Sequence, residues 1–238
     1  MLVKRIYILV VVGLMMAACG ASEQELFDEG VRQLEAGEYN KSVGYFDKVI
    51  EKNEENTSAF NAKGVALFQQ QKFDEAIKAF TSSIRLDSTS YKPFFNRGNA
   101  YLEKKAYKEA IRDYNVASGL DAQQVDVYYN RGLALLAQEE YEDAIMDFDM
   151  ALQATPDQAL VHFNKAKAQL GNNDPLGGME SLINAINLDN NNGSAYYLLG
   201  VTQMSALNQK EEGCANLKMA LNLGYADAQT WIDDFCKE

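Results

Sequence analysis

The chain contains 238 residues, with 34 acidic residues against 22 basic ones and a formal net charge of −12. An acidic surface of this kind repels the phosphates of nucleic acids and the headgroups of anionic lipids, so neither is an expected partner. The chain has one histidine and three cysteines, and they form no cluster with the spacing of a zinc site.

The first 18 residues predict a leader that is removed from the mature protein. Lys4 and Arg5 form a short basic start, and an uncharged, mostly apolar run of 13 residues extends from Ile6 to Ala18. This run is too short to cross a bilayer, which takes about 20 apolar residues. The ending, Met16 to Cys19, resembles the bacterial lipobox, in which a signal peptidase cuts before a lipid-modified cysteine. An ordinary secreted protein and an uncleaved anchor remain as alternatives.

The lipobox resemblance implies a lipoprotein signal peptide at 1–18, a lipidation site at Cys19 and a short tether at 19–22. Two or three acyl chains hold a protein on a membrane stably, whereas one chain does so only reversibly. The expected location is therefore the bacterial cell envelope, tethered to a membrane, with the outer membrane favoured and the protein facing the periplasm or the cell surface.

The rest of the chain repeats one pattern with a period of 34 residues. Small residues mark each copy: Gly30, Gly64, Gly98, Gly132, Ala166 and Gly200. Large apolar residues follow sixteen positions later, and the sixth is shifted by one inserted residue: Phe46, Phe80, Tyr114, Phe148, Leu182 and Leu217. Small residues let two antiparallel helices approach closely, and the large side chains fill the space between hairpins. Strand signals are absent.

This pattern resembles the tetratricopeptide repeat (TPR) over residues 23 to about 227. The resemblance implies an all-α fold, a right-handed superhelical solenoid of six helix-turn-helix repeats with a concave groove. The repeats are expected at 23–56, 57–90, 91–124, 125–158, 159–192 and 193–227. Residues 228–238 are predicted to form a capping helix, with Trp231 as an apolar filler of the core.

Two local features depart from the pattern or add to it. In repeat five, Asp174 is predicted to cap a helix whose first turn holds Pro175, and the glycines that follow predict local mobility. Cys214 and Cys236 lie on the last repeat and the capping helix, where a structural disulfide is the favoured interpretation in an oxidising compartment. Two buried thiols are the main alternative, and a redox function is disfavoured because no C-x-x-C spacing exists.

No catalytic motif is present, so the chain is not expected to be an enzyme. His162 occupies the aromatic position of repeat five, which favours a packing role. The segment Asp189 to Gly193 superficially resembles a calcium loop, but Leu188 and Leu199 stand where the first and last ligands are needed. We therefore expect no metal and no cofactor.

In TPR proteins the first helix of each hairpin lines the groove, and this mapping gives the candidate binding residues. In repeats three to six they are Phe95, Asn96, Asn99, Tyr129, Asn130, Phe163, Asn164, Lys167 and Tyr197. Carboxamides both donate to and accept from a peptide backbone, and rings provide contact area. An alternative of equal weight is that the asparagines stabilise neighbouring hairpins.

The groove does not match the carboxylate clamp of chaperone-binding relatives, because Phe95, Leu160 and Asn164 occupy the positions where that clamp has cations. Recognition of an EEVD-like tail is therefore not expected. Arg97 and Arg131 each have an aspartate sixteen residues later, which favours a structural ion pair within the hairpin. Binding of a ligand's carboxylate by these arginines is the alternative.

Two functional classes remain open. The favoured one is an adaptor that holds protein or peptide partners at the envelope, as TPR lipoproteins do in pilus assembly, outer-membrane assembly and recruitment of cell-wall hydrolases. The alternative is a carrier that binds a small molecule or a glycan on the groove rings. A deep closed pocket would favour the carrier, and a long open groove would favour the adaptor.

Overall fold

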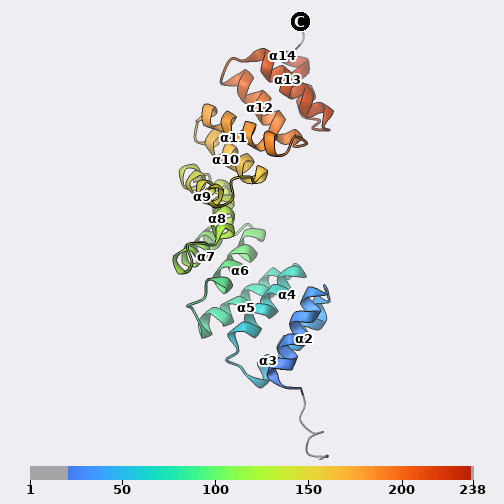
Figure 1. Ribbon diagram of the computed structural model, residues 1–238, viewed down its shortest axis with the longest axis vertical. Helices are drawn as coiled ribbons and strands as arrows, with labels where there is room; N and C mark the ends of the chain where they lie inside the picture. The colour runs from blue at the N-terminus through green and yellow to red at the C-terminus, as the bar shows by residue number, and fades with distance from the viewer. Residues whose placement is uncertain (1–20, 237–238) are drawn as a thin grey trace, which may run out of the picture. The chain divides into compact units, whose positions relative to one another are not determined.

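The computed structural model describes residues 21–236, and within this range the chain forms thirteen α-helices and no strand (Figure 1). The helices are α2 (Glu23–Glu35), α3 (Tyr39–Lys52), α4 (Thr57–Gln69), α5 (Phe73–Leu86), α6 (Tyr91–Glu103), α7 (Tyr107–Leu120), α8 (Val125–Ala137), α9 (Tyr141–Ala154), α10 (Ala159–Gly171), α11 (Pro175–Leu188), α12 (Gly193–Ser205), α13 (Lys210–Asn222) and α14 (Ala228–Phe235). The predicted all-α fold of repeated helices is confirmed. The predicted leader and Cys19 lie outside the described residues.

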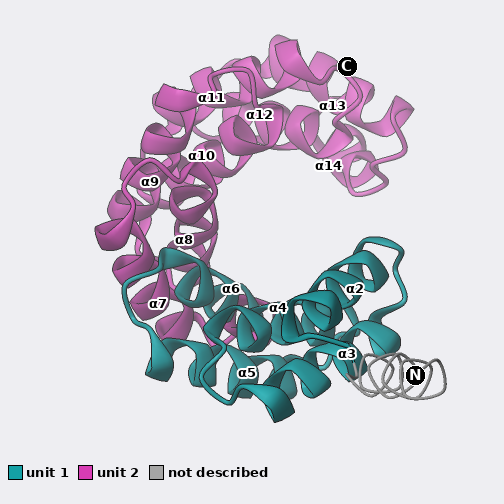
Figure 2. Ribbon diagram, turned by 60° about the horizontal axis from the view of Figure 1, so that its bottom comes forward, with its two compact units in different colours: residues 1–100 teal, residues 101–238 magenta. Residues whose placement is uncertain are grey.

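The chain divides into two compact units, residues 1–100 and residues 101–238 (Figure 2). Unit 1 holds the hairpins α2/α3 and α4/α5 together with α6 up to Ala100. Unit 2 holds α7, the hairpins α8/α9, α10/α11 and α12/α13, and α14. The boundary falls near the end of α6, inside the third predicted repeat.

The turn inside each of the first five hairpins closes in the same way, and the sixth has one inserted residue. After α4, Gln71 adopts a positive φ of 60°, and the N–H of Lys72 donates to the carbonyl of Leu67 at 3.0 Å. This pairing is the Schellman motif, which satisfies carbonyls left free at a helix end. Only the first hairpin places glycine, Gly37, at the left-handed position. The equivalent positions hold the following residues: Gln71, Lys105, Glu139, Asn173 and Asn208.

The small residues of the repeat stand against the large residues of the second helix. A Cβ added to Gly64 would lie 2.5 Å from the Phe80 ring, and one added to Gly132 would lie 2.8 Å from the Phe148 ring. Both rings are fully buried. Ala166 is tolerated in the fifth repeat because the residue sixteen positions later, the buried Leu182, is not aromatic.

Side-chain caps begin several of the first helices. Ser22 and Glu25 form a capping box at the start of α2, and Asn56 accepts from the N–H of Ala59 at 2.8 Å at the start of α4. In repeat five the predicted cap is present, since Asp174 accepts from the N–H of Gly177 at 2.9 Å and Pro175 opens α11. The mobility expected there stays a prediction.

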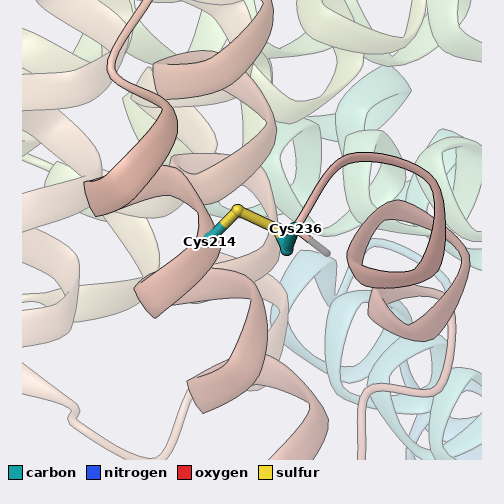
Figure 3. The surroundings of a disulfide bond; sticks show 2 residues. All are labelled: Cys214 and Cys236. Carbon is teal, nitrogen blue, oxygen red and sulfur yellow. A yellow bond between two sulfur atoms is a disulfide. The ribbon is translucent and has the colours of Figure 1, made fainter. Parts of the chain in front are cut away.

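The last helix packs against α12 and α13. Trp231 and Ile232 of α14 contact a cluster built on the buried Leu217, Ala220 and Ala228. Phe235 lies against Trp231, with ring centroids 5.2 Å apart, but remains about half exposed. Cys214 on α13 is joined to Cys236, directly after α14, by a disulfide (Figure 3). The covalent link therefore holds α14 on the sixth hairpin.

Candidate partner-binding site

Unit 2 has an open hollow of about 450 Å³ between α8 and α10. Its apolar side comes from Leu133, Leu136 and Ala137 of α8 together with Tyr141 at the start of α9. Asn164, Lys167 and Gly171 of α10 complete the wall. Gly171 accommodates the Tyr141 ring, because a Cβ there would lie 2.6 Å from its Cζ. Two of the predicted groove residues, Asn164 and Lys167, thus meet in this hollow.

The Asn164 amide is occupied by a neighbouring hairpin. Asn164 is only 7% exposed, and its Nδ2 donates to the Tyr129 hydroxyl at 3.2 Å. Partial burial raises the pKa of the Tyr129 phenol, and the hydrogen bond from Asn164 opposes that rise. The Tyr129 ring packs against Phe148 with centroids 6.1 Å apart. These two predicted binding residues therefore join the fourth hairpin to the fifth.

The other predicted residues of unit 2 differ in exposure. Lys167 is exposed and places its Nζ 5.8 Å from the centroid of the half-buried Phe163 ring. Asn130 is half-buried on α8. Tyr197 stacks on Tyr225, with centroids 4.7 Å apart, and belongs to the cluster that α14 contacts. Tyr225 of the chain's own C-terminal segment thus packs on the half-buried Tyr197, whereas the α8/α10 hollow of unit 2 is open.

Unit 1 has its own hollow on the first helices of its hairpins, with a volume of about 420 Å³. The lining includes Phe27, Ser58, Asn61, Ala62, Lys92 and Pro93. Asn96 Nδ2 donates to the side-chain Oδ1 of Asn61 at 3.0 Å, so this predicted residue also links two successive hairpins. Phe95 and Asn99 are half-buried on α6. Asn96 and Asn164 thus both donate to a neighbouring hairpin, as expected if these asparagines stabilise the contact between hairpins.

In repeats two to five a cation lies one residue before the small residue and reaches back to the preceding hairpin. Lys63 pairs with Asp47 at 2.5 Å and Lys165 with Asp149 at 2.6 Å. Arg97 donates to Thr81 at 3.1 Å, and Arg131 donates to Asn115 at 2.8 Å. The partner residue lies in every case sixteen positions earlier in the chain. This spacing is present in the sequence but was not among the predictions.

The predicted ion pair between Arg131 and Asp147, within the fourth hairpin, is confirmed. The Arg131 Nε and Nη2 both donate to the Asp147 carboxylate at 2.7 Å, and Nη1 donates to Ser118 at 3.0 Å. The hydrogen bonds to Asp147 raise the pKa of Arg131, while burial raises the pKa of Asp147 against the opposing effect of Arg131. A bidentate pair this deeply placed is structural, since only 7% of the Asp147 side chain is exposed.

His162 forms a hydrogen bond with the preceding loop. Its Nε2 lies 3.0 Å from the Pro156 carbonyl oxygen, which requires Nε2 to donate. One repeat earlier, the Tyr128 hydroxyl donates to the Ala122 carbonyl at 3.0 Å in the same way. Residues 21–236 contain no group of three or more His, Cys, Asp or Glu side chains arranged to hold a metal. In the same range no helix has the length and apolar character to span a bilayer.

Comparison with known proteins identifies the repeat. Three family models match the chain: one described as "Tetratricopeptide repeat" at residues 27–91, one described as "TPR repeat" at 98–139, and a second "Tetratricopeptide repeat" at 125–158. Together they cover more than half of the chain. The chain therefore belongs to the tetratricopeptide repeat family. A sequence search of curated proteins gives no match.

Solved structures share the fold at low sequence identity. YrrB, "a TPR protein with an unusual peptide-binding site", is 21% identical with a TM-score of 0.70, over 75% of this chain and 92% of that one. PilF of Pseudomonas aeruginosa is 17% identical with a TM-score of 0.72, over 87% and 96%. MamA of Desulfovibrio magneticus RS-1 is 16% identical with a TM-score of 0.68, over 71% and 96%.

Several lining residues were outside the predicted set. Leu136, Ala137, Tyr141 and Gly171 reach the unit 2 hollow from the ends of helices, whereas the prediction took residues from the middle of the first helix only. One signal was available in the sequence. Tyr141 lies nine residues after Gly132, at a position where Tyr39, Phe73 and Tyr107 also place rings. A ring repeated at a hairpin turn indicates contact with the next hairpin.

Proposed function

We propose that this TPR protein is a lipid-anchored adaptor of the bacterial cell envelope that binds a protein or peptide partner in the α8/α10 hollow of unit 2. The observation that carries the proposal is the open hollow itself, whose apolar floor is bordered by the exposed cation Lys167. A shallow site of this kind suits the side chains of an extended or helical peptide. The peptide-binding site named for YrrB supports the same use of the fold.

The carrier alternative has less support. Small-molecule sites bury most of the ligand surface in a cleft of about 300–1,000 Å³. The unit 2 hollow has a suitable volume, but it is open to solvent and borders the exposed residues Ala137, Glu139 and Lys167. Two of the four rings that the sequence offered as stacking platforms contact other side chains of this protein, since the Tyr129 hydroxyl accepts from Asn164 and the Tyr197 ring packs on Tyr225.

The binding site is tested by blocking the hollow without disturbing the core. Ala137 ends α8, lines the hollow and is exposed, so Ala137→Arg fills the site from its rim. Ala154 ends α9 and is also exposed, so Ala154→Arg serves as the matched control. Partners are captured by crosslinking in intact cells with the full chain. Loss of a captured protein in Ala137→Arg but not in Ala154→Arg is expected, and equal capture by both variants rejects the site.

The anchor is tested separately at Cys19. The lipobox resemblance and the start of α2 at Glu23, capped by Ser22, support a tether of only a few residues, about 10 Å long when extended. Cys19→Ser is expected to abolish labelling by a radioactive fatty acid and to move the protein from the membrane fraction to the soluble fraction. Unchanged labelling and fractionation would reject the lipoprotein assignment and leave the binding proposal standing.

A further inference from the structure

A second hollow in unit 2 lies between α7 and α9, over α8, and shares no lining residue with the α8/α10 hollow. We call it the α7/α9 furrow. Its volume is about 320 Å³, and its lining includes Ile111, Asn115, Leu135, Glu140, Asp143 and Met146. The Arg131–Asp147 pair also borders it and fixes its walls, because Arg131 bonds Asn115 of α7 and Asp147 of α9 at once.

One wall of the furrow is apolar and open to solvent. Met146 lines the furrow and is 59% exposed. Met150, one turn further along α9, is 44% exposed but lies outside the lining. Leu135 and Ile111 provide apolar surface deeper in the furrow. Methionine side chains are unbranched and polarizable, so they adapt to the shape of an incoming apolar group. This wall therefore favours a partner with an apolar side chain to insert.

The α9 side of the furrow is strongly negative, whereas α7 carries two acidic and two basic residues. Repeat four, residues 125–158, contains eight acidic residues and a single basic one, Arg131. Arg131 is committed to Asp147, and Asp149 is paired with Lys165 of the next hairpin. The other six acidic residues include Glu140 and Asp143, which are exposed and line the furrow. A cationic partner is attracted to this surface and an acidic one is repelled.

Unit 1 contains the equivalent hollow with different chemistry. It lies two repeat lengths earlier and has Lys63 for Arg131, Leu67 for Leu135, Glu75 for Asp143 and Lys78 for Met146. Lys78 places a cation where unit 2 has an exposed methionine, so charges of both signs border the hollow of unit 1. The combination of methionine and carboxylates is thus a property of repeat four and not of the repeat in general.

We propose that the α7/α9 furrow docks a basic amphipathic helix of a protein partner. An apolar side chain of that helix inserts beside Met146 and over Leu135, while lysine or arginine residues on its flanks meet Glu140 and Asp143. Burial of the apolar group provides affinity, and the carboxylates provide selection for a cationic partner. Since the furrow and the α8/α10 hollow are lined by different residues, the chain holds two partners through one unit.

The test uses a synthetic helical peptide with leucine and lysine at amphipathic spacing, titrated against the full chain by fluorescence anisotropy. Met146→Lys is expected to weaken binding at least about tenfold, which corresponds to about 1.4 kcal/mol. Asp143→Asn is expected to weaken it about threefold. A peptide with serine in place of leucine, and one with glutamate in place of lysine, are expected to bind at least about tenfold more weakly.

Matched variants separate a docking site from general charge attraction. Asp157→Asn removes the same charge from an exposed position of repeat four outside the furrow lining and is expected to leave affinity unchanged. Lys78→Met changes the equivalent hollow of unit 1, and Ala137→Arg blocks the α8/α10 hollow. Neither variant is expected to change the affinity for the peptide. Each of three outcomes overturns the proposal. The wild type and Met146→Lys bind the peptide equally well, or Asp143→Asn and Asp157→Asn lose the same affinity, or the leucine–lysine peptide does not bind at about 1 mM.

Discussion

Lys63 in unit 1 and Arg131 in unit 2 occupy the same position of the repeat, yet their surroundings differ. The Lys63 ammonium contacts Asp47, whose side chain is 43% exposed, whereas Arg131 binds Asp147, which is 7% exposed, and adds Asn115 and Ser118. The large apolar residues that remain exposed in the described chain lie in unit 2, from Val116 to Phe235. One packing rule therefore supports two different surfaces.

The shared rule and the variable surface have separate physical origins. Gly64 against Phe80 and Gly132 against Phe148 repeat the same close contact in both units, because a Cβ at either glycine would overlap the ring. The surface positions that differ between the two units take no part in this contact. Their residues are free to specialise, and in unit 2 they combine carboxylates with exposed methionines.

Among substitutions that compare the two units, the largest change in the free energy of unfolding is expected at Arg131. Arg131→Leu leaves the buried Asp147 without its cation and is expected to lower the free energy of unfolding by about 3–5 kcal/mol. Lys63→Leu removes a partly exposed pair and is expected to cost less than about 1 kcal/mol. Urea denaturation gives both values, and hydrogen exchange locates the change. Similar costs at the two sites would show that burial does not separate the units.

The second effect concerns the disulfide, which has no counterpart in unit 1 because Cys214 and Cys236 both lie in unit 2. Cys236→Ser opens a loop with a sequence separation of 22 residues. The chain-entropy model gives a loss of up to about 3 kcal/mol. Amide exchange in α14 and at the end of α13 is expected to accelerate while the amides of α2 to α5 keep their rates. Unchanged exchange in α14 would show that packing of Trp231 alone holds the cap.

The third effect tests the rule that both units share. Gly132→Ala is expected to cost about 1–3 kcal/mol, because the added Cβ overlaps the Phe148 ring. Adding Phe148→Leu is expected to recover part of this loss, since the fifth repeat combines Ala166 with Leu182 naturally. Gly64→Ala with Phe80→Leu is the same test in unit 1. A double-mutant cycle with no coupling in either unit contradicts the packing rule.

The smallest effect is a pH dependence in unit 1. Hydrogen bonds from Asn56 and Asn53 lower the pKa of Glu23 below its ordinary 4.5. A carboxylate with a depressed pKa in the folded state stabilises that state above pH 4.5, and the contribution is lost as the pH falls through the folded pKa. Glu23→Gln is therefore expected to be less stable than the wild type at neutral pH and equal to it in acid. A difference that persists in acid would assign the effect to packing.

Much of the fold was readable from the sequence because its packing rule is local and repeats. The 34-residue spacing of Gly30, Gly64, Gly98 and Gly132 fixes which residues of two successive helices touch. The cap at Asp174 and the pair Arg131–Asp147 were predictable for the same reason, since each joins residues within one hairpin. The left-handed turn residues were missed, because only Gly37 carries the glycine signal for that conformation.

The candidate site was less predictable because it depends on contacts between hairpins. Asn96 and Asn164 have the side chains of peptide-binding residues, but each donates its amide to the preceding hairpin. Tyr197 has the ring of a groove residue, but Tyr225 stacks on it. No spacing in the sequence distinguishes an amide that faces a partner from one that bonds a neighbour.

By itself, the sequence determined that this protein consists of TPR hairpins, because a small residue and a large one placed sixteen positions apart recur along the chain and contact each other across two helices. The tertiary structure alone decided which polar groups are consumed by neighbouring hairpins and which surfaces stay open. It depends on side-chain positions across repeats: Arg131 on α8 hydrogen-bonds to α7 and α9, and Tyr225 packs on Tyr197.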